Sequence, residues 1–139
     1  MFRVIIAGSR DFNDYDFLCH IMDRLLSNYT QENIQIVCGM AKGADTCGER
    51  YAKEHRYKIR YFQADWDRYG AAAGPIRNEE MALNADALVA FWDGKSPGTK
   101  SMIQLAQKYN LQIRIKKYKY HSKENRIYQI GIFCFFGHK

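Results

Sequence analysis

The sequence lacks the cysteine and histidine arrangements that hold metals or build nucleophilic catalytic devices. No C-x-x-C pair and no metal-ligand spacing occurs among its cysteines and histidines, which are Cys19, Cys38, Cys47, Cys134, His20, His55, His121 and His138. No Ser/His/Asp or Cys/His set is recognisable either. We therefore expect no metal and no cofactor, and any acid–base chemistry falls to carboxylates. The carboxylates in candidate segments are Asp45, Glu49, Asp65, Glu79 and Asp93.

Long apolar runs are also missing. No stretch approaches the ~20 residues that a membrane-spanning helix needs, and residues 1–7 are followed at once by turn and charged residues, unlike a secretory leader. Three of the cysteines lie in periodic or apolar segments, where a buried thiol is the common interpretation. The sequence therefore indicates a cytoplasmic protein with reduced cysteines and no membrane partner.

Over most of its length the chain has no excess of either charge. Residues 1–113 hold 14 Lys and Arg against 14 Asp and Glu, whereas residues 114–139 hold 7 basic residues and one acidic residue, Glu124. The formal net charge of +6 therefore describes the tail rather than the domain. With 139 residues and 47% hydrophobic content, the chain has the size and composition of one globular domain.

Two kinds of apolar segment alternate along the chain. Short β-branched runs predict strands at residues 2–7, 34–38, 58–62, 86–92 and 111–115, and apolar residues at helical spacing predict helices at residues 18–29, 44–55, 75–83 and 98–109. Asn13 or Asp14 can cap the first helix. Pro75 suits the first turn of the third, where its missing N–H costs nothing.

This alternation implies parallel pairing and right-handed crossovers. The predicted fold class is therefore α/β, a Rossmann-like doubly wound fold with a mostly parallel five-stranded sheet in the order 3-2-1-4-5. Strands one and four are then neighbours at the switch point, where such sheets bind ligands. The loops at residues 8–10 and 94–99 would face each other across one crevice and share one ligand.

Both of those loops have the chemistry of an anion site. The first offers backbone N–H groups, a hydroxyl and a guanidinium, and the second opens a helix whose dipole and N–H groups favour phosphate or carboxylate. A tight turn and an ordinary helix cap are the plain alternatives. The candidate ligand- or phosphate-binding residues here are Gly8, Ser9, Arg10, Asp93, Gly94, Ser96, Gly98 and Thr99.

Three other segments add candidates. A second glycine loop opens the second helix, where two acids either hold ribose hydroxyls or simply favour the helix start. The longest connection, residues 63–74, carries a Trp that can stack on a base or cover the core. The next helix begins with a fork donor and polar side chains. The residues concerned are Gly39, Gly43, Asp45, Glu49, Asp65, Trp66, Arg77 and Asn78.

Together these motifs resemble the SLOG superfamily, the Rossmann-like group that contains DprA-type and LOG-type proteins, and most of all its small YspA-like members. The resemblance covers roughly residues 1–115. It rests on Ile-Ile-Ala-Gly-Ser-Arg-Asp-Phe at residues 5–12, Gly-Met-Ala-Lys-Gly-Ala-Asp at residues 39–45 with Glu49, and the segments 64–66, 73–78 and 85–99. It implies a pocket for a nucleotide or nucleotide-derived small molecule, with the glycine loops on phosphate.

The resemblance also raises an enzymatic alternative. LOG-type enzymes hydrolyse the N-glycosidic bond of nucleoside monophosphates; Arg77 looks like their arginine, and Gly98-Thr99 looks like the end of their Pro-Gly-Gly-x-Gly-Thr-x-x-Glu loop. The position of their Glu is Met102 here, and a thioether can neither stabilise an oxocarbenium-like centre nor carry a proton. The catalytic candidates are then Arg77 and Glu79, with Asp65 as another substitute. We expect binding, for sensing or processing, rather than turnover.

We divide the chain into a nucleotide-ligand-binding domain, residues 1–116, and a C-terminal extension, residues 117–139. A basic, aromatic-interleaved run over residues 116–126 precedes a strand-like apolar run over residues 127–136. We expect an added C-terminal strand or hairpin, or a subunit contact in a homo-oligomer. The alternative is DprA-like binding of single-stranded nucleic acid through Tyr118, Tyr120 and Tyr128.

Overall fold

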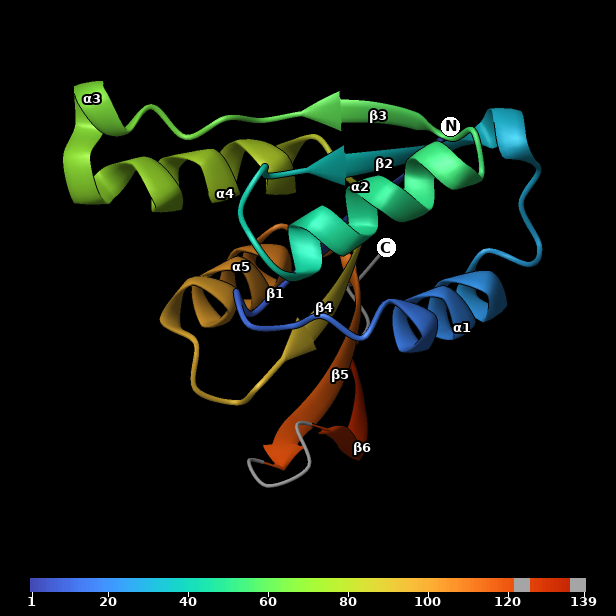
Figure 1. Cartoon of the computed structure of the whole chain (residues 1–139). Helices are drawn as coiled ribbons and strands as arrows, with labels where there is room; N and C mark the ends of the chain where they lie inside the picture. Colours follow the sequence, from blue (N-terminus) through green and yellow to red (C-terminus); the bar gives the residue numbers. More distant parts are fainter. Residues whose placement is uncertain (122–125, 136–139) are drawn as a thin grey trace.

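A six-stranded sheet forms the centre of the molecule in the computed structural model, which describes residues 1–121 and 126–135, with side chains as far as Tyr118 (Figure 1). The strands are β1 (Phe2–Gly8), β2 (Ile34–Cys38), β3 (Lys58–Tyr61), β4 (Ala87–Trp92), β5 (Gln112–His121) and β6 (Arg126–Phe135). Their order is β3-β2-β1-β4-β5-β6. The first five are parallel, and β6 runs antiparallel to β5. The predicted fold class, strand order and added C-terminal strand are confirmed.

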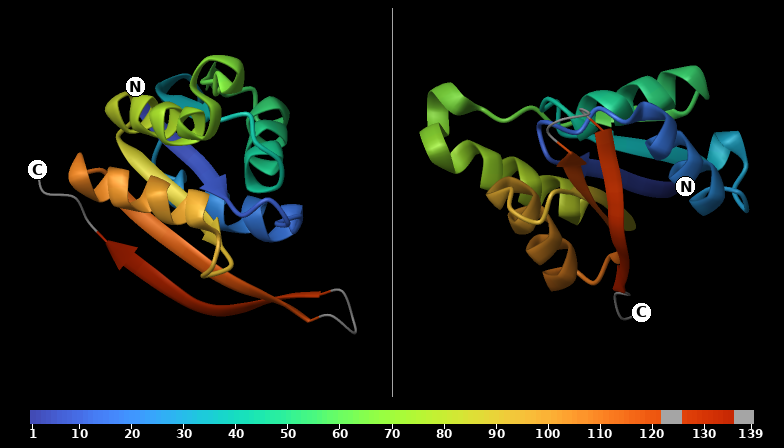
Figure 2. Two further views of the ribbon diagram at one scale, coloured as in Figure 1. Left: turned by 90° about the vertical axis from the view of Figure 1, so that its left-hand side faces the viewer. Right: turned by 60° about the horizontal axis from the view of Figure 1, so that its bottom comes forward.

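Helices cover both faces of the sheet (Figure 2). They are α1 (Tyr15–Leu25), α2 (Ala44–Glu54), α3 (Trp66–Tyr69), α4 (Ala73–Leu83) and α5 (Pro97–Lys108). Because β1 is central, its alternate side chains enter different cores: Val4 and Ile6 pack with α1 and α2, and Ile5 packs with α4 and α5. This is why the strand reads as a continuous apolar run.

The local signals for helix starts have the predicted roles. Asp14, one of the two proposed caps, accepts a hydrogen bond from the Phe17 N–H at 3.1 Å. Pro75 lies in the first turn of α4, as expected. The connection after β3, predicted to be the longest, contains α3 and a 3-10 turn (Gly70–Ala72). Asp65 explains α3, because its carboxylate caps the Arg68 N–H at 3.1 Å.

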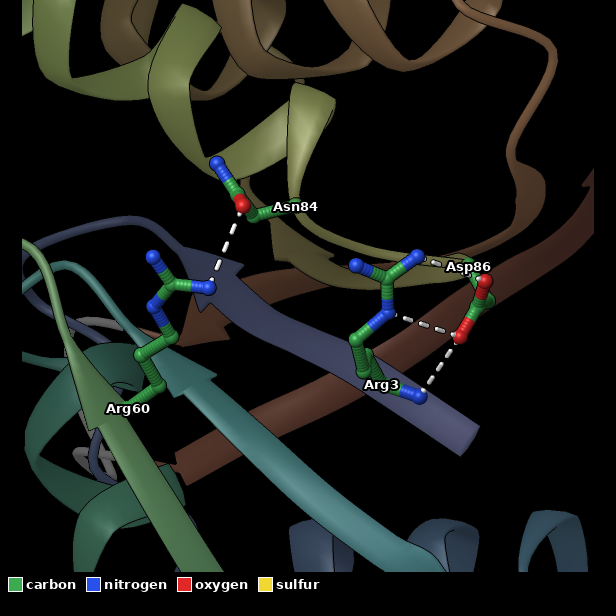
Figure 3. A network of polar contacts seen from close by, with 4 residues as sticks. All are labelled: Arg3, Arg60, Asn84 and Asp86. Carbon is green, nitrogen blue, oxygen red and sulfur yellow. Dashed lines mark hydrogen bonds and ion pairs between the residues drawn. The ribbon is translucent and has the colours of Figure 1, made fainter. Parts of the chain in front are cut away.

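At the amino ends of the strands, polar contacts hold neighbouring elements in register (Figure 3). Asp86 precedes β4 and accepts from the backbone N–H of Arg3 at 2.9 Å and from its guanidinium at 3.1 and 3.2 Å. Arg60 of β3 donates to Asn84, which follows α4, at 3.1 Å. The Arg3–Asp86 contact lies at the end of the sheet opposite the loops that carry the predicted site.

The C-terminal part of the chain differs most from expectation. Strand β5 continues to His121, so the predicted division at residues 116/117 falls inside one strand. Lys116 and Tyr118 were expected on a solvated basic run, yet both are buried. Tyr118 therefore cannot serve as a stacking platform for nucleic acid, while the side chains of Tyr120 and Tyr128 lie outside those described. The predicted subunit contact stays a prediction.

None of the helices in the described part of the chain combines the length and apolar character that a membrane crossing requires.

Candidate functional site

A cleft of about 550 Å³, here called the switch-point cleft, opens where β1 and β4 end side by side. It is lined by the loops after both strands, the first turns of α2 and α5, and the middle of α4. The predicted residues that line it are Gly8, Ser9, Arg10, Asp45, Arg77, Asn78, Asp93, Ser96, Gly98 and Thr99. Segments far apart in the sequence therefore meet in one hollow, at the place where doubly wound sheets bind ligands.

Ser9 ties the loops of the cleft together and is 2% exposed. Its N–H donates to the Phe91 carbonyl at 3.0 Å, and its hydroxyl accepts from the Asp93 N–H at 3.1 Å. Its carbonyl accepts from the Ala44 N–H, at the start of α2, at 3.3 Å. The preceding residue is Gly8, and no side chain fits there, because a Cβ would lie 2.1 Å from the Phe91 carbonyl oxygen. The loop after β1 is thus built into both neighbouring loops.

The loop after β4 prepares the N-terminus of α5. Asp93 accepts from the N–H groups of Lys95 and Ser96, both at 2.8 Å. Burial opposes ionisation of Asp93, but these hydrogen bonds hold its pKa below the ordinary value. No side chain in the described part of the chain caps α5, and Pro97 has no N–H to offer. The N–H groups of Gly98 and Thr99 are therefore the first backbone donors of α5 that an anion in the cleft could reach.

A buried carboxyl and a half-buried guanidinium form another wall of the cleft. Asp45 is 6% exposed and accepts from the Ala41 N–H at 3.1 Å. Burial raises the pKa of Asp45 to about 6, against the lowering effects of that hydrogen bond and of the Arg77 charge. Burial lowers the pKa of Arg77, whose guanidinium donates to the Gly39 carbonyl and, at 2.9 Å, to Asn78. This wall therefore contains a carboxyl group that gains or loses its proton near pH 6.

Glycine is required beside this pair. A Cβ at position 39 would lie 2.8 Å from a carboxylate oxygen of Asp45 and 3.3 Å from Nη1 of Arg77. Asn78 continues the wall toward α5, since its amide donates to the Gly98 carbonyl at 3.4 Å. Met102, which occupies the position of the enzymatic Glu, also lines the cleft and is 1% exposed.

Several predicted residues lie outside the switch-point cleft. Glu49 accepts from the Tyr61 hydroxyl at 2.6 Å and pairs with Lys53, because it lies one turn further along α2 than Asp45. Glu79 accepts from the Tyr109 hydroxyl at 2.7 Å and lies 3.7 Å from the Lys108 ammonium. The others outside are Gly39, Gly43, Asp65, Trp66 and Gly94.

A second hollow of about 330 Å³, here called the Trp66 hollow, adjoins the cleft. Gly39 and Trp66, two of the predicted residues, line it. Arg10, Ala41 and Arg77 line both the hollow and the cleft. The remaining lining residues are Met40, Lys42, Gln63 and Ala64.

Other residues that line the cleft were not among the predicted binding or catalytic residues. They are Ala7, Asp11, Ala41, Met81, Pro97 and Met102. Asp11 directly follows the Gly8-Ser9-Arg10 motif, so its position in the loop was a usable signal. Its partner was not predictable: the Tyr118 hydroxyl donates to Asp11 at 2.6 Å across 107 residues of sequence.

Comparison with known proteins identifies a matching family, a relative in sequence and a solved structure of similar fold. The model of the YspA, cpYpsA-related SLOG family matches residues 2–69. The Gene 61 protein of Mycobacterium phage D29 is 34% identical over 123 residues, which cover 81% of this chain and 94% of that protein. The X-ray structure of DNA processing protein A (DprA) from Streptococcus pneumoniae matches with a TM-score of 0.63 and 17% identity, over 81% of this chain and 48% of that one. This chain spans about half of that DprA chain, and the likeness is one of fold.

Proposed function

This chain belongs to the YspA, cpYpsA-related SLOG family, and we propose that its switch-point cleft binds a nucleotide or a nucleotide-derived small molecule. The family and the Rossmann-like fold support nucleotide- or nucleic-acid-related binding in general. The observation that carries the narrower proposal is the convergence of the loops after β1 and β4 on the uncapped N-terminus of α5.

The donors in the cleft suggest how such a ligand lies. A phosphoryl group accepts hydrogen bonds from the N–H groups of Gly98 and Thr99 and from the guanidinium of Arg10. Arg10 is exposed and lines the same cleft. Asp45 and Asn78 face the middle of the cleft, where a carboxyl and an amide can bind sugar hydroxyls. Met81 and Met102 supply the apolar surface.

Calorimetric titration with AMP tests this proposal. Arg10→Ala removes a charged donor and Thr99→Ala removes a hydroxyl, so we expect the affinity to fall roughly tenfold or more for the first and by a smaller factor for the second. Arg24→Ala, which removes an exposed charge from α1 far from the cleft, is the matched control. Unchanged affinity of both cleft variants for AMP, ADP and cyclic nucleotides would contradict the proposal.

A second candidate function is hydrolysis of the N-glycosidic bond of the bound nucleotide. One observation favours it: Asp45 lies in the cleft, and its pKa of about 6 suits a general acid or base. Against it, the cleft has Met102 in place of the enzymatic Glu, and Glu79 is engaged elsewhere by Lys108 and Tyr109. Release of free base from AMP, abolished in Arg77→Ala and Asp45→Asn, would establish turnover. A wild-type protein that binds AMP and leaves it intact would exclude it.

A further inference from the structure

The switch-point cleft and the Trp66 hollow adjoin each other but differ in charge. Their common wall consists of Arg10, Ala41 and Arg77. The cleft contains the carboxyl groups of Asp11, Asp45 and Asp93. Among the described residues, no carboxyl group lines the hollow, which adds Lys42 to the two arginines. An anionic group therefore gains more from the hollow than from the middle of the cleft.

Two of the three cations in the hollow are available to a ligand. Arg10 and Lys42 are exposed, and neither side chain makes a hydrogen bond or ion pair with any described residue. Their loops are held against each other, because the backbone of Gly43 packs so closely on Ser9 and Arg10 that a Cβ would lie 2.3 Å from the Ser9 carbonyl oxygen. The structure therefore keeps two positive charges, with no partner among the described residues, on neighbouring loops.

The far side of the hollow is formed by an aromatic ring. Trp66 is 52% exposed although it is a large apolar side chain. It is held by the short helix α3, capped by Asp65, and its ring lies over Gly74, where an added Cβ would meet it at 3.3 Å. A planar group that extends from a phosphate beside Arg10 and Lys42 can stack on this ring.

We propose that the Trp66 hollow is a second phosphoryl subsite of the ligand that the switch-point cleft binds. The ligand class is then a nucleotide with at least two phosphoryl groups, such as a nucleoside diphosphate or a pyrophosphate-linked derivative. One group binds at the N-terminus of α5, and the other binds between Arg10 and Lys42. This assignment rests on the proposed function and narrows it from nucleotides in general.

The test compares ADP with AMP by calorimetry at constant ionic strength. We expect the wild type to bind ADP roughly tenfold more tightly than AMP, since the second group gains charge-assisted hydrogen bonds. Lys42→Ala, at a residue that lines only the hollow, should remove most of this preference and leave AMP affinity unchanged. Trp66→Ala should leave AMP affinity unchanged and weaken binding of NAD, a pyrophosphate-linked derivative that carries a second planar group beyond its phosphoryl groups. Lys58→Ala removes an exposed charge at the opposite end of β3 and should change neither affinity.

The failures of the two proposals are distinguishable. If AMP binds in an Arg10-dependent way, but ADP binds no more tightly and Lys42→Ala has no effect, the subsite is wrong and the proposed function stands. An equal loss of AMP and ADP affinity in Lys42→Ala also overturns the subsite, because the charge then acts over the whole cleft. If a thymidine oligonucleotide binds more tightly than ADP with the same dependence on Lys42 and Trp66, the ligand is a nucleic acid strand. If no nucleotide binds, both proposals fail.

Discussion

At the scale of single residues, the chemistry of the cleft depends on side chains that lie next to each other but face different directions. Asp45 enters the cleft, while Glu49 on the same helix is bound by Tyr61 and Lys53. Asn78 faces α5 through the Gly98 carbonyl, while the adjacent Glu79 is turned toward the end of that helix. A carboxylate that binds a neighbouring element contributes to stability, and one that lines the switch-point cleft can contact a ligand there.

Asp45 makes the stability of the fold depend on pH. Its pKa rises on folding from the ordinary value of 3.8 to about 6, so between these values the native state binds more protons than the unfolded state. Stability is therefore lost as pH rises through this window, on the order of 3 kcal/mol. Asp45→Asn should remove that loss and be more stable than the wild type at pH 7. Urea denaturation at pH 4.5, 5.5 and 7 measures it; a constant difference between the two proteins would contradict the burial argument.

Two glycines in the loops around the cleft should respond differently to substitution by alanine. Gly43 has a φ of +78°, and an added Cβ would lie 2.3 Å from the Ser9 carbonyl oxygen, so Gly43→Ala should cost more than about 2 kcal/mol. At Gly98 nothing lies within 4 Å of the added Cβ, and Gly98→Ala should leave stability unchanged or raise it by up to about 1 kcal/mol. Thermal denaturation compares them. An equal loss in both would mean that the close approach at Gly43 is relieved by movement.

At the scale of elements, opposite ends of the same strands have different roles. The amino ends of β1 and β4 are joined by the Arg3–Asp86 ion pair, and their carboxyl ends diverge into the loops of the cleft (Figure 3). Strand pairing holds those loops in register, since Gly8 lies opposite Phe91. The positions of the cleft loops therefore depend on contacts that lie outside the cleft.

Asp86→Asn tests this separation of roles. Burial raises the pKa of Asp86, but the hydrogen bonds and charge of Arg3 outweigh it and hold the pKa below 3.8. The stabilisation is therefore present at neutral pH and lost as pH falls below that value. We expect a cost of about 1 kcal/mol at pH 7, reduced by solvent at this partly exposed pair, and unchanged AMP affinity. Denaturation and calorimetry report the two effects, with Asp67→Asn as control; a loss of affinity would contradict the separation.

At the scale of the whole molecule, the C-terminal strands β5 and β6 belong to the same sheet as the strands β1 and β4 that end at the switch-point cleft. Tyr118 of β5 is 1% exposed, packs edge-on against Phe12 at 5.2 Å between ring centroids, and donates to Asp11 in the loop after β1. A segment that the sequence divides from the domain thus supports the edge of the cleft.

Substitutions at Tyr118 should show that dependence. Tyr118→Phe removes the hydrogen bond to Asp11 and should cost about 1 kcal/mol, whereas Tyr118→Ala also empties a core position and should cost about 3–5 kcal/mol. Tyr69→Phe, at an exposed ring, is the control for losing a hydroxyl and should be neutral. Urea denaturation supplies the measurement. If Tyr118→Ala unfolds at the same urea concentration as the wild type, β5 beyond Ile115 is separable from the domain.

The sequence predicted the sheet order, the switch point and the two loops that meet there. Those predictions succeeded because they use local signals: the period of apolar residues, the glycines after strands, and caps such as Asp14. It did not predict that Lys116 and Tyr118 are buried, since basic and aromatic residues in a row have the composition of a solvated face. It also grouped Trp66 with the cleft residues, whereas α3 places the ring in an adjoining hollow.

By itself, the sequence therefore determined which elements form and which loops meet at the switch point, because periodicity, turn residues and helix starts act between neighbours along the chain. Only the tertiary structure decided which carboxyl enters the cleft, that burial raises the pKa of Asp45 to about 6, and that cations with no partner among the described residues gather beside Trp66. Those properties depend on groups brought together from different strands and helices, and on how much water their packing excludes.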